Sequence, residues 1–271
     1  MAINDIHVQI ATAAPPLEPV SSRKGTTFRA PIYDVFRTRR LAYLKLLKIE
    51  DIAREALCAV LARVVALPIA QAFYVYVDPV YVPGHLSGNI HKLAFGLEQD
   101  HFPAFRIADD QIHDEIRRWD EALVCAVFDQ WIFNEDRLPK NLLRASNKVF
   151  WLIDHDEALP NSAHADDVCN SQILQVLGEG KTELELHRLK REALYVVDRF
   201  KNINWRDVAQ FVLPPDLAMS GIDRYVEKHI KFLRQRIAYM PDILTHSLKI
   251  KQLDMKLDGD TAPVDWEEKK S

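Results

Sequence analysis

Three side chains near the middle of the chain have the types and the spacing that phosphoryl transfer requires. Asp136 and Asn141 stand five residues apart in the run N-E-D-R-L-P-K-N, and Asp154 follows thirteen positions later, directly after the apolar residues W-L-I. In such a reaction one carboxylate accepts a proton from the attacking hydroxyl, while an amide and a second carboxylate bind the magnesium ions that neutralise the phosphates. The pattern predicts a kinase in which Asp136 is the catalytic residue and Asn141 and Asp154 are metal ligands.

The elements around these residues are predicted to bring them to one place. Apolar residues at helical spacing indicate one long amphipathic helix from about residue 112 to Trp131. Pro139 keeps the following polar loop from continuing as helix, and a turn at residues 146–148 leads into a buried-type strand over residues 149–153. This order of elements would place the side chains of Asp136, Asn141 and Asp154 at one site. The alternative is an ordinary loop with surface acids, since N-x-D-R alone is common by chance.

A lysine and a glutamate in the first half of the chain indicate a second part of the same site. Lys45 lies in an apolar strand predicted over residues 41–47, where an unpaired ammonium group would be costly to bury. Glu55 lies about one turn into the following helix and is within reach of Lys45. In a kinase such a pair binds the nucleotide phosphates. Alternatively, Lys45 lies on the solvent face of an edge strand and Glu55 on an exposed helix face; Lys48 is the rival lysine.

The composition limits the class of protein. The 271 residues are 48% hydrophobic and 27% charged, which is typical of a soluble globular protein with a sizeable core. The formal net charge of −4 argues against a mainly nucleic-acid-binding surface. No apolar run is long enough to span a bilayer, no signal-peptide pattern opens the chain, and the cysteines lack metal-ligand spacing. We therefore expect a cytoplasmic protein that binds neither nucleic acid nor membrane directly.

Strand-like and helix-like segments are distributed unequally along the chain. Up to about residue 98 the pattern predicts strands with one helix between them, and after it mostly helices, among them residues 183–201 and 222–240. The predicted fold class is α+β with two lobes. Its parts are a flexible N-terminal arm over residues 1–22, a small β-rich lobe with one main helix over 23–98, a larger, mostly helical lobe over 99–250, and a charged tail over 251–271.

Four segments together resemble the HipA-like kinase family. They are A-Y-L-K-L-L at Lys45, R-E-A-L-C-A-V-L-A-R-V-V-A-L-P-I-A-Q at Glu55, W-I-F-N-E-D-R-L-P-K-N-L-L at Asp136, and V-F-W-L-I-D-H at Asp154. The resemblance covers roughly residues 22–160 and is strongest in the block around Asp136.

The resemblance implies a protein-kinase-like two-lobed fold, ATP and magnesium as cofactors, and transfer of the γ-phosphate to a hydroxyl, foremost that of Ser or Thr in a protein. By position it makes Asp136 the catalytic acid/base, Asn141 and Asp154 the metal ligands, Lys45 the phosphate-binding lysine and Glu55 its partner. Relatives include toxin kinases that phosphorylate a protein serine and are held by a DNA-binding antitoxin. The resemblance therefore implies a protein substrate and suggests an antitoxin-like or regulatory protein as a partner.

The chain departs from the family pattern or from ordinary kinases at three places. The only glycine before Lys45 is Gly25, so no G-x-G-x-x-G is present, as in other HipA-like kinases. Lys140 stands where close relatives often have glycine, and His-Asp rather than Phe-Gly follows Asp154. The missing glycine-rich loop leaves open how the phosphates are covered, and the His-Asp sequence leaves open how the segment after Asp154 is regulated.

Two other functions share much of this pattern. Small-molecule kinases, such as lipid and antibiotic kinases, also have D-x-x-x-x-N and a later Asp. A non-catalytic kinase-like module would bind nucleotide or partner only, and it would be expected to lack Asp136, Asn141 or Asp154, all of which are present. A metal hydrolase built on the scattered histidines has no supporting ligand spacing.

Overall fold

The computed structural model describes residues 6–20, 27–82, 92–99, 111–137, 141–146, 149–215, 217 and 221–250. Strands dominate this part of the chain up to residue 99, and helices dominate the remainder, so the mixed class predicted from the patterning is observed. The expectations for Gly25, Pro139, Lys140 and the tail over residues 251–271 fall outside the described residues.

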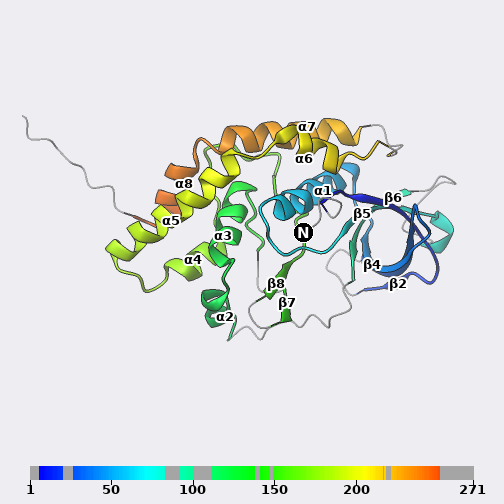
Figure 1. The fold of residues 1–271 in the computed structure, drawn as a ribbon, viewed down its shortest axis with the longest axis horizontal. Coiled ribbons are helices and arrows are strands. Elements are labelled where there is room, and N and C mark those ends of the chain that lie inside the picture. The colour runs from blue at the N-terminus through cyan, green and yellow to red at the C-terminus, as the bar shows by residue number, and fades with distance from the viewer. Residues whose placement is uncertain are drawn as a thin grey trace, which may run out of the picture.

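Six strands form one sheet that closes on itself. They are β1 (Gln9–Ala13), β2 (Glu18–Pro19), β3 (Thr27–Asp34), β4 (Arg39–Lys45), β5 (Ala72–Val77) and β6 (Lys92–Glu98). The order is β1-β5-β6-β4-β3-β2, and an additional pairing joins β1 to β3. All but β2 therefore make a closed ring, at the right of Figure 1. Closure leaves those strands without a free edge, and it was not predicted from the sequence.

β1 corrects the expectation of a flexible arm over residues 1–22. This strand runs parallel to β5 and antiparallel to β3, and Ala11 and Ala13 are buried inside the ring. Just before it, the Val8 amide donates to the Phe211 carbonyl at 2.9 Å. The strand signal is weak in this segment because alanine is a poor strand former. The pairing partners on both sides supply the stability instead.

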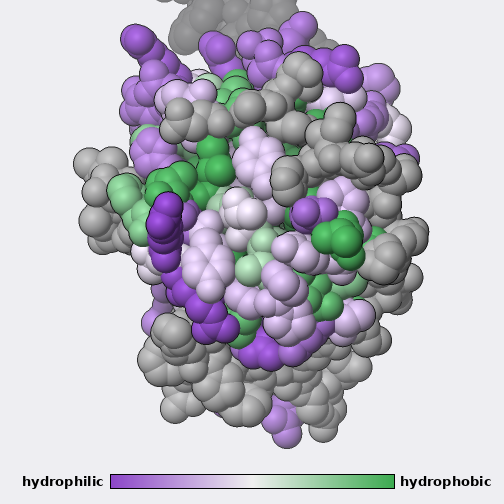
Figure 2. Space-filling view, turned by 90° about the vertical axis from the view of Figure 1, so that its right-hand side faces the viewer, coloured by the Kyte–Doolittle hydropathy of each residue, from purple (hydrophilic) through white to green (hydrophobic). Residues whose placement is uncertain are grey.

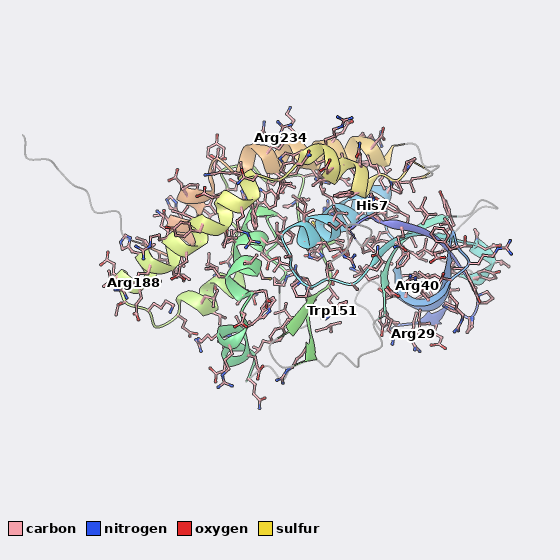
Figure 3. All side chains as sticks on the ribbon, in the orientation of Figure 1. His7, Arg29, Arg40, Trp151, Arg188 and Arg234 are labelled. Atoms are coloured by element: carbon pink, nitrogen blue, oxygen red, sulfur yellow. The ribbon has the colours of Figure 1, made fainter. Side chains whose placement is uncertain are left out.

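Small and large side chains alternate inside the ring. Ala30 and Ile32 of β3 and Ala42 and Leu44 of β4 are among its fully buried residues. Arginines also connect neighbouring segments of the sheet (Figure 3): Arg40, on the same face of β4 as Ala42 and Leu44, has its Nη1 2.8 Å from Glu98 Oε1, and Arg29 Nε is 2.7 Å from Gln99 Oε1. Figure 2 shows the molecule from the side of the closed sheet, where small apolar areas are interrupted by polar side chains.

One helix, α1 (Ile49–Val64), lies between the closed sheet and the later helices (Figure 1). It contacts β5 and β6 on one side and α6 (Trp205–Val212) and α7 (Ile222–Arg236) on the other. Every residue from Ile52 to Arg63 is buried, as expected for a helix that is apolar on most of its faces. Glu55 is thus fixed in the interior of the protein.

The single helix predicted from about residue 112 to Trp131 is wrong, because the structure has two. α2 (Ile112–Arg118) is followed by Trp119, which has extended backbone angles, and α3 (Ala122–Trp131) begins three residues after Trp119. The Trp119 ring is buried and lies 5.1 Å from that of Phe150, between ring centroids. Helical spacing of the apolar residues persists across this break, so the periodicity did not reveal it.

After α3, a short hairpin and five helices complete the described chain. In the hairpin β7 (Leu142–Ser146) pairs with β8 (Val149–Leu152), as predicted. α4 (Gln172–Gly178) precedes α5 (Glu183–Lys201), which has the predicted bounds and begins with a capping box of Thr182 and Glu185. The helix predicted over residues 222–240 is α7, and α8 (Met240–Ser247) follows it. None of the helices in these described segments combines the length and apolar character needed to cross a bilayer.

Candidate active site

Lys45, Glu55 and Asp154 meet where the end of β4, the second turn of α1 and the end of β8 come together. Lys45 Nζ donates to Asp154 Oδ1 at 2.6 Å and forms an ion pair with Glu55 Oε1. The Glu55 side chain is fully buried, whereas that of Lys45 is 18% exposed. β4 is an inner strand, so Lys45 does not lie on an edge strand. The rival Lys48 is exposed at the N-cap of α1.

Attraction between Lys45 and the two carboxylates keeps these three groups charged. Burial alone would raise the pKa of Glu55, but Lys45 and His155 outweigh it and lower that pKa to about 2. Burial would lower the pKa of Lys45, but the two carboxylates raise it. Burial opposes ionisation of Asp154 as well, and Lys45 again lowers its pKa overall. The site therefore presents one cation between two carboxylates at neutral pH.

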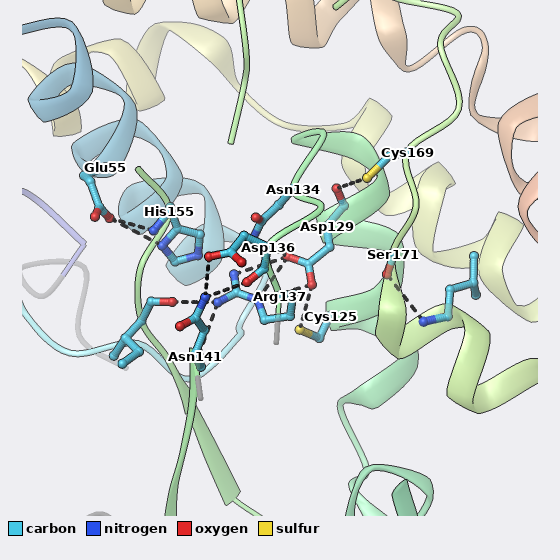
Figure 4. A network of polar contacts seen from close by, with 12 residues as sticks. Glu55, Cys125, Asp129, Asn134, Asp136, Arg137, Asn141, His155, Cys169 and Ser171 are labelled. Carbon is cyan, nitrogen blue, oxygen red and sulfur yellow. Dashed lines mark hydrogen bonds and ion pairs between the residues drawn. The ribbon is translucent and has the colours of Figure 1, made fainter. Parts of the chain in front are cut away.

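Asp136 and Asn141 face each other across the loop that follows α3 (Figure 4). Asn141 Nδ2 donates to Asp136 Oδ2 at 3.1 Å and to the Asp136 carbonyl at 2.5 Å. The Ile153 amide donates to the Asn141 carbonyl at 3.2 Å, which places Asn141 beside the residue that precedes Asp154. The two parts of the predicted site thus lie at the same end of the β7–β8 hairpin.

A buried ion pair holds this loop in place. Arg137 Nη2 lies 3.2 Å from Asp129 Oδ1 of α3, and neither side chain is exposed (Figure 4). Arg137 Nη1 also donates to the Ile153 carbonyl at 2.7 Å and to that of Asn141 at 3.4 Å. Arg137 thereby connects α3, the loop and the end of β8. Removing one member of such a pair would leave an uncompensated buried charge.

Asp154 itself has an uncommon backbone conformation. Its φ angle is +65°, in the left-handed region that residues other than glycine adopt at a cost of about 1–3 kcal/mol. Such a conformation persists only where the surrounding structure fixes it, and such residues cluster at functional sites. Here it directs the Asp154 carboxylate toward Lys45.

Several residues of this site were missed by the sequence reasoning. His155 donates its amide to Glu55 Oε2 at 3.1 Å, and Arg54 Nη1 donates to the Asp156 carbonyl at 2.6 Å. Carboxylate oxygens of Glu55, Asp154 and Asp156 lie within 4.8 Å of one another. Two signals were available: ionisable residues directly after Asp154, and Asp129 within the apolar run A-V-F-D-Q-W.

The donor atoms fit a hard divalent cation bound next to phosphates. Magnesium prefers oxygen ligands, and the carboxylate of Asp154 and the amide of Asn141 provide them. Glu55 is already engaged at both oxygens, by Lys45 and by the His155 amide, so its first role is to hold Lys45. Lys45 supplies a positive charge that suits a phosphate oxygen.

A separate cavity of about 540 Å³ lies among α2, α4 and the residues after α8. Its lining includes Arg137 but, among the described residues, neither Lys45 nor Asp154. Because Lys45, Glu55 and Asp154 do not line it, we do not assign a nucleotide to this cavity.

Comparisons with known proteins identify the family. A family model described as HipA-like kinase matches residues 44–205, more than half of the chain, and this range contains all five predicted site residues. Among solved structures, the crystal structure of the Helicobacter pylori proinflammatory kinase CtkA is similar, with 11% sequence identity, 88% of this chain and 96% of that chain covered, and a TM-score of 0.47. No curated protein matches the sequence. On the strength of the family match, this chain belongs to the HipA-like kinase family.

Proposed function

We propose that this protein is an ATP- and Mg²⁺-dependent kinase that transfers the γ-phosphate to a hydroxyl group, that of Ser or Thr in a protein. The family is one of phosphotransferases. The observation that carries the proposal is the contact of Lys45 with both Glu55 and Asp154, which joins a strand, a helix and a hairpin end. A phosphate-binding lysine that is held in this way is a part of the kinase mechanism.

Each side chain has a role in the proposed reaction. Asp136 accepts the proton of the attacking hydroxyl, and Lys45, held by Glu55, binds nucleotide phosphates. Asn141 and Asp154 would hold magnesium, which neutralises the charge that develops on the phosphates. The hydrogen bond from Asn141 Nδ2 to Asp136 Oδ2 fixes the orientation of the catalytic carboxylate.

The two-lobed arrangement is part of this proposal. The closed sheet would form the small lobe, and the helices after residue 99 would form the large one, with the nucleotide between them. The limits at residues 23–98 and 99–250 stay predictions. The position of α1 supports the proposal, because this helix contacts both the sheet and the later helices and carries Glu55 between them.

The nature of the acceptor rests on the family alone. A protein substrate, an antitoxin-like or regulatory protein partner and a cytoplasmic location are proposals that follow from the resemblance to HipA-like kinases. A small-molecule kinase and a non-catalytic nucleotide-binding module are the alternatives. The second alternative is disfavoured by the presence of all five predicted site residues, since loss of function usually removes one of them.

Labelling distinguishes these functions. The purified protein is incubated with γ-labelled ATP and magnesium in a cell lysate, beside the Asp136→Asn variant. We expect a labelled protein with the native chain and at least about a hundredfold less label with the variant, because general-base catalysis contributes about 10²–10⁴ in rate. The variant should still bind ATP and unfold at the same temperature, since the side chain changes little in size.

Other outcomes identify the alternatives. A labelled metabolite would indicate a small-molecule kinase, and ATP binding without transfer would indicate a non-catalytic module. Near-native transfer by Asp136→Asn would remove Asp136 from its role, and failure of the native protein to bind ATP would contradict the proposal as a whole.

A further inference from the structure

Three side chains hold the main chain on both sides of Asp154. On the residue before it, Arg137 Nη1 donates to the Ile153 carbonyl at 2.7 Å. On the two residues after it, Glu55 Oε2 accepts from the His155 amide at 3.1 Å, and Arg54 Nη1 donates to the Asp156 carbonyl at 2.6 Å. Two of these three holding residues, Arg54 and Glu55, are consecutive in α1.

These contacts surround a residue that needs them. The left-handed φ angle of Asp154 is unfavourable for an L-amino acid and requires neighbouring interactions to persist. The contact to Asp156 is the last of the three along the chain, and it is made to a carbonyl rather than to a side chain. It therefore restrains the path of the backbone, whatever side chains stand at positions 155 and 156.

Arg54 has no role in the reaction as proposed so far. Its side chain is 9% exposed, and the same Nη1 atom also donates to Asp51 Oδ1 at 2.6 Å, one turn earlier in α1. The contact with Asp51 fixes the guanidinium group on the helix surface. A charged donor to a carbonyl in so protected a place is stronger than a neutral hydrogen bond. Since α1 is buried between sheet and helices, Arg54 connects a rigid element to the segment that carries the metal ligand.

We propose that Arg54 is a positioning residue which, through the main chain of Asp156, keeps the Asp154 carboxylate directed at Lys45 and at the metal. The metal-related part of this inference rests on the proposed function. Without Arg54, the segment over residues 154–156 visits conformations in which Asp154 points elsewhere. The affinity for magnesium then falls in proportion to the fraction of molecules that keep the competent conformation.

The test compares Arg54→Met with Arg54→Lys and with Arg63→Met. Arg63 is a matched control, since it is a buried arginine of the same helix that donates to Gln71 Oε1 and to the Ile69 carbonyl. Amide hydrogen exchange is measured without nucleotide in peptides that cover residues 153–157. We expect faster exchange in Arg54→Met, an intermediate rate in Arg54→Lys, which keeps one donor, and native exchange in Arg63→Met.

The second measurement is the magnesium concentration that gives half-maximal phosphoryl transfer at saturating ATP. Substitution of residues that orient metal ligands commonly weakens metal binding by about 10–100-fold, so Arg54→Met should raise this concentration at least about tenfold. A purely structural role would lower the melting temperature and the amount of active enzyme, with no change in the magnesium requirement.

The two proposals fail in different ways. Native exchange at residues 153–157 in Arg54→Met, or an unchanged magnesium requirement, would overturn the positioning role of Arg54. If the native protein shows no magnesium-dependent binding of ATP, the proposed function falls, and faster exchange in Arg54→Met would still establish that Arg54 holds the segment.

Discussion

Lys45 shows how much a single residue and its neighbours can explain. Its ammonium group lies between two carboxylates that come from a helix and from a hairpin end, and its charge stabilises both of theirs. The sequence predicted the contact with Glu55, because a lysine in an apolar strand needs a partner and the next helix offers one. The contact with Asp154 required the fold, since the two residues are 109 positions apart.

The choice between the two neighbouring lysines can be tested. Lys45→Met should lower kcat/KM for ATP by about 10²–10³, as is usual when one preorganised hydrogen-bond donor to the transition state is removed. Lys48→Met should stay within about twofold of the native value, because Lys48 is exposed at the start of α1. Steady-state kinetics with varied ATP measure both, and thermal unfolding shows that both are folded. The reverse ranking would assign the role to Lys48.

The positions of individual helices and strands were predicted better than which of these elements lie side by side. α5 has its predicted bounds and α7 begins at its predicted first residue, because their apolar spacing is long and regular. β1 was not predicted, since its strand pairing depends on β3 and β5 rather than on its own residues. The closed ring that results leaves little room between strands.

Gly96 of β6 tests how tightly the ring is packed. A Cβ atom at this position would lie 2.9 Å from Val75 Cγ2 and 3.2 Å from Leu44 Cδ2. Gly96→Ala should therefore lower the free energy of unfolding by about 1–3 kcal/mol, the usual cost of overpacking. Denaturant unfolding at equilibrium measures this change.

Gly178 provides the control for this substitution. A Cβ atom there would meet only ordinary contacts at 3.5 Å, so Gly178→Ala should change the free energy of unfolding much less. If Gly96→Ala is as stable as the native protein, the ring can expand, and the closed sheet is more deformable than its contacts suggest.

On the scale of the whole molecule, α7 packs against α1 and carries the buried residue His229. His229 is buried, and the charges of Arg54, Lys228 and Glu50 act on its pKa. Burial, assisted by Arg54 and Lys228, lowers the pKa of His229 from its ordinary 6.5 to about 4. This histidine is therefore neutral in the folded protein at neutral pH.

The stability of the whole fold should depend on this histidine between pH 6.5 and 4. In that interval the unfolded chain binds a proton that the folded protein does not, so the free energy of unfolding falls as the pH falls, by up to about 2–3 kcal/mol. His229→Gln should show a shallower decline. Urea unfolding of both proteins at several pH values from 7 to 4 measures the difference, and identical slopes would show that His229 contributes nothing to it.

The sequence by itself predicted five side chains of the candidate site and the local elements that carry them, because apolar periodicity and the spacing of Asp136, Asn141 and Asp154 are properties of short stretches of chain. Only the tertiary structure decided the closure of the sheet by β1, the break at Trp119, and the hold of Arg54 and Arg137 on the backbone around Asp154. The physical reason is distance along the chain. Arg54 and Asp156 are 102 positions apart, and a hydrogen bond between such residues leaves no periodic pattern near either of them.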